Sequence, residues 1–514
     1  MKLVYDVEDR PKFSKLIVFS FQQLLAIIAA TIAVPAVVNG MLGYPVLDAA
    51  SALVGAGFGT ITYLLFTRFK SPVFLGSSFA FISPLAGAAV FGYFGIMIGA
   101  AFAALVYVII ALVVKFVGTK WISKLMPAVV IGPTVALIGL SLSGSAVSSL
   151  TTASGSGMQY NLVAILCGLF TFFMVVFCSV KGNKTMKIIP FIIGILSGYA
   201  LAAFFSIFGY ACHVDYLKII DFSPLVNNFK DISIQSFLDY PKFTFLATDT
   251  ALDGITKLQS LDGASVATIA LLYIPVSFVV FAEHIADHKN ISSIIERDLL
   301  VKPGLHRTLL GDGIGSLIGA AFGGCPNTTY GESVGCVAIT RNASVVSILG
   351  AAVMAIVLAF FSPVMAFLET IPSCVMGGVC LALYGFIAVS GLNMLRGIDL
   401  GESKNLFTVS SILVSGIGGL SLQFGLATQG KAIVTISSIA TALIIGIVVN
   451  VLFGKKTENE NQEGGDSLPA AYVDGTAESA LKDIQDEKAF ETSEENTAVA
   501  DVAAEGTAEE TVEG

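Results

Sequence analysis

The segment "SPVFLGSSFAFISPLAG" (residues 71–87) combines the hydrophobicity of a membrane span with residues that interrupt helices. Pro72, Gly76 and Pro84 break its pattern. A second segment, "GGCPNTTYGESVG" (residues 323–335), has the same character. Non-helical backbone is tolerated inside a bilayer only where protein or a cavity covers its N–H and C=O groups. Both segments are therefore predicted to be unwound and to face a cavity, where a planar polar solute can pair with the free backbone.

The composition around these segments is that of a membrane protein. Of the 514 residues, 55% are hydrophobic and only 13% are charged, whereas soluble domains carry about 25% charged residues. The formal net charge of −9 comes from the C-terminal tail, where residues 455–514 contain 17 acidic residues and four lysines. We expect this acidic tail to be disordered. The rest of the chain is predicted to be a polytopic membrane protein.

Hydropathy and helix breakers divide the chain into about fourteen predicted membrane segments. A span of about 20 apolar residues is needed to cross the hydrocarbon core, and the third and tenth segments are short. The predicted segments are 15–39, 47–66, 71–89, 91–114, 122–142, 160–180, 186–208, 266–287, 306–323, 326–340, 343–362, 364–391, 405–424 and 430–453.

The basic residues indicate the orientation of these segments. With a cytoplasmic N-terminus, the connections predicted inside carry Lys or Arg, whereas the short outside connections 39–48 and 143–159 carry none. This is the positive-inside bias. The connection 209–265 contains lysines, but long loops cross largely regardless of charge. Both termini are therefore predicted to be cytoplasmic, in a multi-pass protein of the cell (inner) membrane.

Seven plus seven segments imply an inverted repeat, because an odd-numbered half that is duplicated must enter the membrane in the opposite orientation. Paired short segments interrupted by Gly or Pro mark the binding site in transporters of this kind. The third and tenth segments are such a pair. The predicted organisation is a cytoplasmic N-terminus (1–14), a first repeat (15–208), an extracytoplasmic connection (209–265), a second repeat (266–453) and the acidic cytoplasmic tail (454–514).

Four ionisable residues follow a long apolar run in "FVVFAEHIADHKN" (residues 278–290). An intramembrane carboxylate is costly and marks a functional site by default, so Glu283 is the principal candidate. On a helix, Glu283 and Asp287 share one face and His284 and His288 a neighbouring one. The group is predicted to bind a proton. Two alternatives remain: a buried polar network that only joins helices, and an interfacial position for His288.

Glu332 is a second carboxylate in an improbable place, between Gly331 and Gly335 of the interrupted tenth segment. It is predicted to accept a hydrogen bond from a ligand N–H group, although a position at the positive end of a helix also suits it. Gln22 and Gln23 lie in the first segment and are either interhelical hydrogen-bonding groups or substrate contacts.

Other patterns favour ordinary interpretations. "GDGIGSLIG" (residues 311–319) lies within a membrane segment and indicates packing of small residues. The "EHIADH" group (residues 283–288) has metal-ligand residue types, but one short helix cannot easily surround an ion with them. We expect no metal, cofactor, nucleic-acid partner or enzymatic activity; an intramembrane hydrolase is the remote alternative.

Four motifs together resemble the nucleobase–cation symporter-2 (nucleobase–ascorbate transporter) family, and within it the uracil permeases. They are "FLGSSFAFISP" (74–84), "AEHIADH" (282–288), "KPGLHRTLLGDG" (302–313) and "PNTTYGESVGCVAITR" (326–341). "QQLLA" (22–26) and "IPSCVMGGVCLALYG" (371–385) also fit, so the resemblance spans the membrane region.

This resemblance implies an all-α fold of two inverted seven-segment repeats, arranged as core and gate domains. Segments 1–4 and 8–11 would form the core, and segments 5–7 and 12–14 the gate. The third and tenth segments would each contain a short strand, with the base held between them. It also implies a homodimer formed through the gate domain.

The resemblance further implies import of uracil by proton symport with alternating access. Glu283 and Glu332 would bind the base, with backbone groups near Ser78, Phe79 and Gly331. The uracil ring is expected to stack near Phe79 or Tyr330. The alternatives are a xanthine or other purine, or an anion carried by the same fold.

Two departures from the family pattern affect these expectations. Some relatives place a histidine four residues after the eighth-segment glutamate, where this chain has Asp287 followed by His288. The proton is therefore assigned to the group Glu283, His284, Asp287 and His288, without a choice among its members. Relatives also have Gln-His in the first segment, where this chain has Gln22-Gln23.

Overall fold

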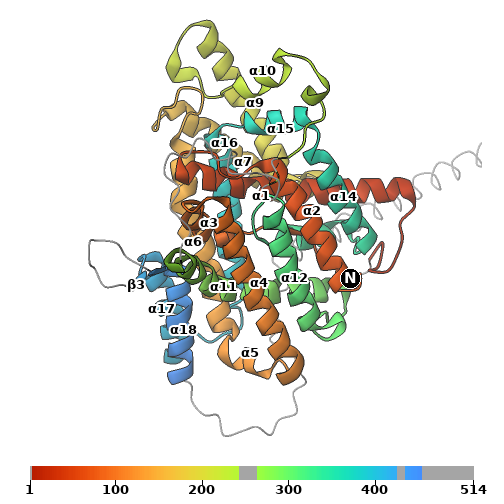
Figure 1. Ribbon diagram of the computed structural model, residues 1–514, viewed down its shortest axis with the longest axis vertical. Helices are drawn as coiled ribbons and strands as arrows, with labels where there is room; N and C mark the ends of the chain where they lie inside the picture. The colour runs from red at the N-terminus through yellow and green to blue at the C-terminus, as the bar shows by residue number, and fades with distance from the viewer. Residues whose placement is uncertain (1–2, 242, 244–262, 425–433, 454–514) are drawn as a thin grey trace, which may run out of the picture. The chain divides into compact units, whose positions relative to one another are not determined.

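The computed structural model describes residues 3–241, 243, 263–424 and 434–453, and the chain they form is predominantly helical (Figure 1). The acidic tail predicted at 454–514 lies outside the described residues, as does part of the predicted connection 209–265.

The first half contains six helices of membrane length, and a strand and two short helical turns stand in place of the third segment. The helices are α1 (Phe13–Leu42), α2 (Ala49–Phe66), α4 (Gly92–Val117), α6 (Ala128–Thr151), α7 (Leu162–Lys181) and α9 (Pro190–Ala211). The shorter elements are β1 (Leu75–Ser77), η1 (Phe79–Phe81), α3 (Ile82–Ala89), α5 (Lys120–Leu125) and α8 (Lys184–Ile188).

The second half repeats this pattern, after the short elements η2 (Asp215–Leu217), α10 (Ser223–Lys230) and η3 (Ile234–Ser236). Its helices are α11 (Gly263–Ile295), α12 (Leu305–Ala321), α13 (Gly331–Thr340), α14 (Val345–Ala359), α15 (Ser362–Glu369), α16 (Ser373–Asn393), α17 (Ser403–Ile417) and α18 (Ser438–Leu452). The remaining elements are η5 (Leu300–Gly304), β2 (Asn327–Thr329), β3 (Leu422–Phe424) and β4 (Val434–Ile436).

Each of the fourteen predicted segments contains a helix, and the predicted fold class is confirmed. Within the described residues, eight helices are long and apolar enough to cross a membrane: α1, α2, α4, α6, α7, α9, α11 and α16. Three shorter apolar stretches, at η1–α3, α14 and α18, occupy the third, eleventh and fourteenth places. Helices α12, α13 and α17 occupy the other three.

Prolines explain two differences from the predicted boundaries. The fifth segment was expected at 122–142, but Pro127 separates α5 from α6 and serves as the N-cap of α6. The twelfth was expected at 364–391, but Pro372 is the N-cap of α16 and separates it from α15. A proline lacks an N–H group and disfavours helical backbone in the residue before it, so a continuous helix through either position is unfavourable.

Strands β1 and β2 join the two interrupted segments. They pair antiparallel, with Leu75 opposite Thr329, Gly76 opposite Thr328 and Ser77 opposite Asn327. All six residues are buried. Antiparallel pairing is the arrangement expected when two equivalent segments enter the membrane from opposite sides. The two strands predicted for the third and tenth segments are therefore confirmed.

The helices form two packing groups, which correspond to the expected core and gate. In the core group, α12 packs on α2 and α4, α14 on α1 and α2, and α11 on α3 and α4. In the gate group, α6 packs on α16, α17 and α18, and α7 on α9 and α16. The groups meet where α1 contacts α16 and where α11 contacts α6 and α18.

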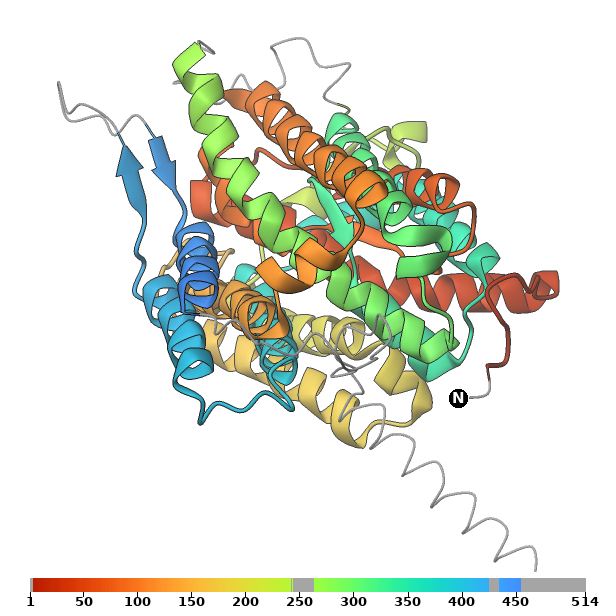
Figure 2. The ribbon, with the colours of Figure 1, turned by 90° about the horizontal axis from the view of Figure 1, so that it is seen from below.

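A second pair of strands, β3 and β4, was not predicted. These strands pair antiparallel between α17 and α18, and Figure 2 shows them as blue arrows at one edge of the molecule. They shorten both helices relative to the predicted segments 405–424 and 430–453.

The small residues of α12 allow close helix packing, as the sequence indicated. A Cβ atom on Gly315 would lie 2.8 Å from the Gly59 carbonyl oxygen of α2, and one on Gly313 would lie 2.6 Å from Tyr107 Cβ of α4. Real Cβ atoms essentially never approach so closely. The packing interpretation of residues 311–319 is therefore confirmed.

Candidate functional site

The paired strands position the aromatic side chain of Tyr330, which immediately precedes α13. Its hydroxyl donates a hydrogen bond of 2.8 Å to the Ser77 carbonyl oxygen of β1. Its ring covers Gly76, where a Cβ atom would lie 2.4 Å from the ring carbons. Tyr330 is buried, with 2% of its surface exposed. The tyrosine therefore fixes one interrupted segment against the other.

Ser78 and Phe79 lie in the turn between β1 and α3. Ser78 donates its backbone N–H to the Pro326 carbonyl oxygen at 3.0 Å. Its buried side-chain hydroxyl has no hydrogen-bond partner within the described part of the chain. The Phe79 ring meets the Tyr384 ring of α16 edge to face, with centroids 5.6 Å apart. This turn therefore offers an unused polar group and an aromatic contact with the gate group.

Glu332 occupies the first turn of α13, directly after the unwound backbone. It is partly exposed, whereas the next two residues, Ser333 and Val334, are buried. The first N–H groups of a helix have no intrahelical partner and carry partial positive charge. The carboxylate is therefore favoured by the helix end, as one of the two sequence interpretations expected, and its binding of a ligand N–H group stays a prediction.

Glu283 lies on α11 and is also partly exposed, between the buried residues Ala282 and His284. It is close enough to Asp287, Glu332 and Asp312 to interact with their charges. The structure therefore brings Glu283 and Glu332 into one electrostatic neighbourhood, although 49 positions separate them in the sequence.

Asp287 connects α11 to the strand pair. Its Oδ2 atom accepts a hydrogen bond of 2.6 Å from the Thr329 hydroxyl of β2. A Cβ atom on Gly331 would lie 3.7 Å from its other carboxylate oxygen. The carboxylate therefore contacts the same unwound segment that leads to Glu332.

The two histidines of α11 make different contacts. His284 Nδ1 lies 2.7 Å from Asp312 Oδ2 of α12, and His288 Nε2 lies 2.5 Å from the Tyr63 hydroxyl of α2. Neither imidazole has any exposed surface. Of the two positions considered for His288, the buried one is correct and the interfacial one is wrong.

Asp312 and Tyr63 were not among the predicted site residues. Asp312 lies within "GDGIGSLIG" (residues 311–319), which was interpreted through its glycines alone. A carboxylate in a membrane segment was a sufficient signal by itself. Tyr63 gave no such signal, because a tyrosine in an apolar helix is ordinary; Tyr384 was missed for the same reason.

Gln23 joins the first helix to the tenth segment. Its Nε2 atom donates to the Ser333 hydroxyl at 2.5 Å, and the same hydroxyl accepts the Phe74 N–H at 3.1 Å. Gln22 is different, because its buried Oε1 atom has no hydrogen-bond partner among the described residues. Gln23 is therefore an interhelical hydrogen-bonding group next to Glu332.

Comparison with known proteins identifies the family. Residues 14–424 match the family model described as the Permease family. The chain belongs to this permease family. It is accordingly a multi-pass membrane protein, and the resemblance indicated by its motifs is confirmed.

Curated permeases match almost the whole chain. A uracil permease from Bacillus caldolyticus is 37% identical over 464 residues, which cover 90% of this chain and 97% of the relative. A uracil permease from Bacillus subtilis (strain 168) is 35% identical over 464 residues, which cover 89% of this chain and 97% of the relative. The fold is shared more widely. The transmembrane domain of a cyanobacterium bicarbonate transporter, BicA, aligns with a TM-score of 0.51 at 13% identity, covering 86% of this permease and 99% of that chain.

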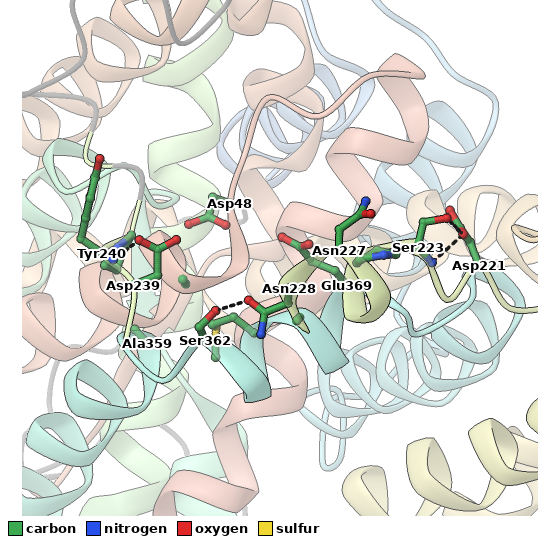
Figure 3. A pocket seen from close by; sticks show the side chains of 15 residues that line it. Asp48, Asp221, Ser223, Asn227, Asn228, Asp239, Tyr240, Ala359, Ser362 and Glu369 are labelled. Atoms are coloured by element: carbon green, nitrogen blue, oxygen red, sulfur yellow. Dashed lines mark hydrogen bonds between the residues drawn. The ribbon is translucent and has the colours of Figure 1, made fainter. Parts of the chain in front are cut away.

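A pocket of about 460 Å³ lies elsewhere in this permease, where α10 and the chain that follows it meet α14 and α15. Figure 3 shows carboxylates and amides around it, and the Ser362 hydroxyl donates to Asn228 Oδ1 at 2.6 Å. None of the predicted site residues lines it. Its lining includes Asp48, Asp221, Asn227, Asp239 and Glu369.

Proposed function

We propose that this permease imports uracil together with protons by alternating access. The observation that carries the proposal is the position of Glu283 and Glu332. Both carboxylates are partly exposed; Glu332 directly follows the unwound backbone, and Glu283 is close enough to interact with its charge. The uracil permeases at 35–37% identity support the choice of base.

The chemistry of uracil suits these groups. The base is planar and neutral, and it alternates N–H donors with carbonyl acceptors. Carboxylate oxygens of Glu283 and Glu332 accept from its N–H groups, and backbone N–H groups near Phe79 and Gly331 donate to its carbonyls. The Ser78 hydroxyl, which lacks a partner among the described residues, is a further donor. A site built from such groups rejects an analogue that leaves one of them unpaired.

Aromatic rings complete the proposed site. The Tyr330 hydroxyl donates a hydrogen bond to the Ser77 carbonyl oxygen of β1, and the Phe79 ring contacts the Tyr384 ring of α16. Of the two stacking positions, Phe79 has the added property of touching the gate group. Movement of the core group against the gate group changes this contact, which links occupancy of the site to alternating access.

Proton coupling is assigned to the ionisable residues of α11. A carboxylate that binds the base gains a proton when the site faces outward and loses it when the site faces inward. Location in the inner membrane, cytoplasmic termini and a homodimer belong to the same proposal. The boundaries of the two repeats, at 15–208 and 266–453, also stay a prediction.

Uptake of radiolabelled uracil by permease-deficient cells tests this function. We expect saturable uptake that a proton uncoupler abolishes and that excess xanthine or bicarbonate leaves unchanged. Uptake that xanthine inhibits and unlabelled uracil does not would instead indicate a purine carrier, and inhibition by bicarbonate would indicate an anion carrier.

Glutamine substitutions test the two carboxylates. Glu283→Gln and Glu332→Gln keep the size of each side chain but replace one acceptor oxygen with a donor, so each should reduce uracil uptake to background. Glu402→Gln is the matched control, because Glu402 is exposed at the start of α17. Immunoblots of membranes establish equal amounts of protein. Normal uptake by either site variant would refute its role.

A further inference from the structure

The two imidazoles of α11 form a closed arrangement behind the carboxylates. The rings of His284 and His288 are stacked, with centroids 4.0 Å apart and planes inclined by 28°. Both side chains are fully buried. Every ring nitrogen has a hydrogen-bond partner within the described part of the chain, from α2, α11 or α12.

The partners of His288 determine where its hydrogen lies. Its Nδ1 atom is 2.8 Å from the His284 carbonyl oxygen, and a carbonyl can only accept, so Nδ1 carries the hydrogen. In the neutral ring, Nε2 then accepts from the Tyr63 hydroxyl. The Tyr63 oxygen in turn accepts from the Ser71 hydroxyl, 2.6 Å away. In this arrangement the hydrogens of His288 Nδ1, Tyr63 and Ser71 each make one hydrogen bond, and none of these three side chains carries a charge.

The partners of His284 allow a similar count. The Thr308 hydroxyl donates to the Leu305 carbonyl oxygen at 3.0 Å, so it accepts the His284 Nε2–H, also at 3.0 Å. One further proton then lies between His284 Nδ1 and Asp312 Oδ2. Whichever atom holds it, the His284–Asp312 pair is neutral overall. Where His284 Nδ1 holds it, a second positive charge on the stacked ring of His288 is disfavoured.

The groups around the imidazoles come from several elements. Tyr63 of α2, Tyr107 of α4 and Asp312 of α12 contact the rings. The carboxylates of α11 and α13 contribute charge to the same region, through interactions with Tyr63 and Tyr107 or with one another. These carboxylates are Glu283, Asp287 and Glu332.

We infer that Tyr63 is a positioning residue for uptake: it holds His288 as a neutral acceptor and thereby fixes the face of α11 that carries Glu283 and Asp287. The transported proton then resides on those carboxylates. An O–H bond forms on a carboxylate oxygen when the site faces outward and breaks when it faces inward, and the imidazoles exchange no proton. This inference rests on the proposed function and selects among the four residues assigned to coupling.

A non-titratable replacement of His288 gives the first test. The Oε1 atom of glutamine can accept the Tyr63 hydroxyl as Nε2 does, and glutamine takes up no proton. We expect His288→Gln to retain proton-driven uracil accumulation within threefold of the wild type, whereas His288→Ala loses at least tenfold. Accumulation by His288→Gln that falls further overturns the inference, and the loss of accumulation with intact uracil exchange would assign the proton to His288.

A pair of tyrosine variants gives the second test. Tyr63→Phe and Tyr107→Phe each remove one oxygen from a buried tyrosine beside a histidine, but the Tyr107 hydroxyl has no hydrogen-bond partner among the described residues. We expect Tyr63→Phe to raise the KM of uracil exchange about tenfold without moving the pH midpoint of uptake. Tyr107→Phe should stay within twofold of the wild type in both measurements.

The outcomes separate this inference from the proposed function. A KM for Tyr63→Phe equal to that of Tyr107→Phe, or a shifted pH midpoint, overturns the role of Tyr63. If Tyr63→Phe does not reach the membrane, His288→Gln decides alone. Failure of the proposed function is seen with the wild-type protein, before any variant is compared: the cells take up no uracil, or the uncoupler does not reduce their uptake.

Discussion

Glu283 and His284 are neighbours in sequence, yet their side chains serve different contacts in the structure. Glu283 is partly exposed near Glu332, whereas His284 is buried against Asp312. Adjacent residues on a helix point about 100° apart, because a turn contains 3.6 residues. The ionisable residues of α11 therefore differ in their surroundings: Glu283 is partly exposed, whereas the two histidines join α11 to α12 and α2.

Gln23 and Gln22 provide a comparison of two similar residues. Gln23→Leu removes the donor to the Ser333 hydroxyl and should lower uracil uptake at least tenfold. Ser333 follows Glu332 in the sequence, and its hydroxyl also accepts a hydrogen bond from the Phe74 N–H. Gln22→Leu should be tolerated, since the Gln22 Oε1 atom has no partner in the described residues. Uptake and membrane abundance are measured for both. Equal loss in the two variants would contradict this assignment.

Residue types and spacing were sufficient to propose the carboxylates of the site, but not their partners. A charged residue in an apolar segment is conspicuous, so Glu283, Asp287 and Glu332 could be chosen from the sequence. Tyr63, Thr329 and Tyr384 could not, because hydroxyl and aromatic side chains are common in membrane helices. Their roles depend on three-dimensional contacts between elements far apart in sequence, such as Thr329 with Asp287.

At the level of elements, strand β1 depends on a side chain of α2 for its outer edge. The Thr60 hydroxyl accepts the Leu75 N–H at 2.9 Å and donates to the Leu75 carbonyl oxygen at 3.1 Å. A buried backbone group without a partner costs about 1–3 kcal/mol. The Thr60 hydroxyl therefore supplies the hydrogen bonds for one edge of β1, as β2 does for the other edge.

Replacing this threonine with valine tests the point. Thr60→Val keeps the shape but leaves Leu75 unpaired, so the free energy of unfolding should fall by about 1–3 kcal/mol. Thr62→Val is the control, because among the described residues the Thr62 hydroxyl donates to the Phe58 carbonyl oxygen within its own helix. Thermal unfolding in detergent should show a lower Tm for Thr60→Val alone. A similar Tm for the two variants would count against this role of Thr60.

Hydropathy predicted the elements well where a helix is long, and less well where breaks or strands occur. The interrupted third and tenth segments were identified because Pro and Gly stand out in an apolar context. The β3–β4 pair was missed, because a three-residue strand has no distinctive pattern of hydrophobic residues. Pro127 and Pro372 could have given the helix boundaries directly.

At the scale of the whole molecule, the gate group presents an apolar surface that the core group does not cover. Helices α7 and α9 are the least buried of the eight long helices: 33% of the most apolar 18-residue stretch of α7 is buried, and 28% of that of α9. On α7, Phe173 and Phe177 are 61% and 48% exposed. This face contacts either lipid or a second copy of the chain, and the proposed homodimer requires the second.

The mass of the purified protein distinguishes these two partners of the gate face. Aromatic side chains at an interface contribute strongly to association, so Phe173→Ala with Phe177→Ala should shift the particle from twice the 53.7 kDa of one chain to a single copy. Leu105→Ala with Ile109→Ala is the control, on an equally exposed i, i+4 pair of α4 in the core group. Light scattering that corrects for detergent measures both. A dimer formed through α7 requires the α7 variant to dissociate and the α4 control to stay dimeric. If the α7 variant stays dimeric, or if both variants dissociate, the role of α7 in the dimer is contradicted.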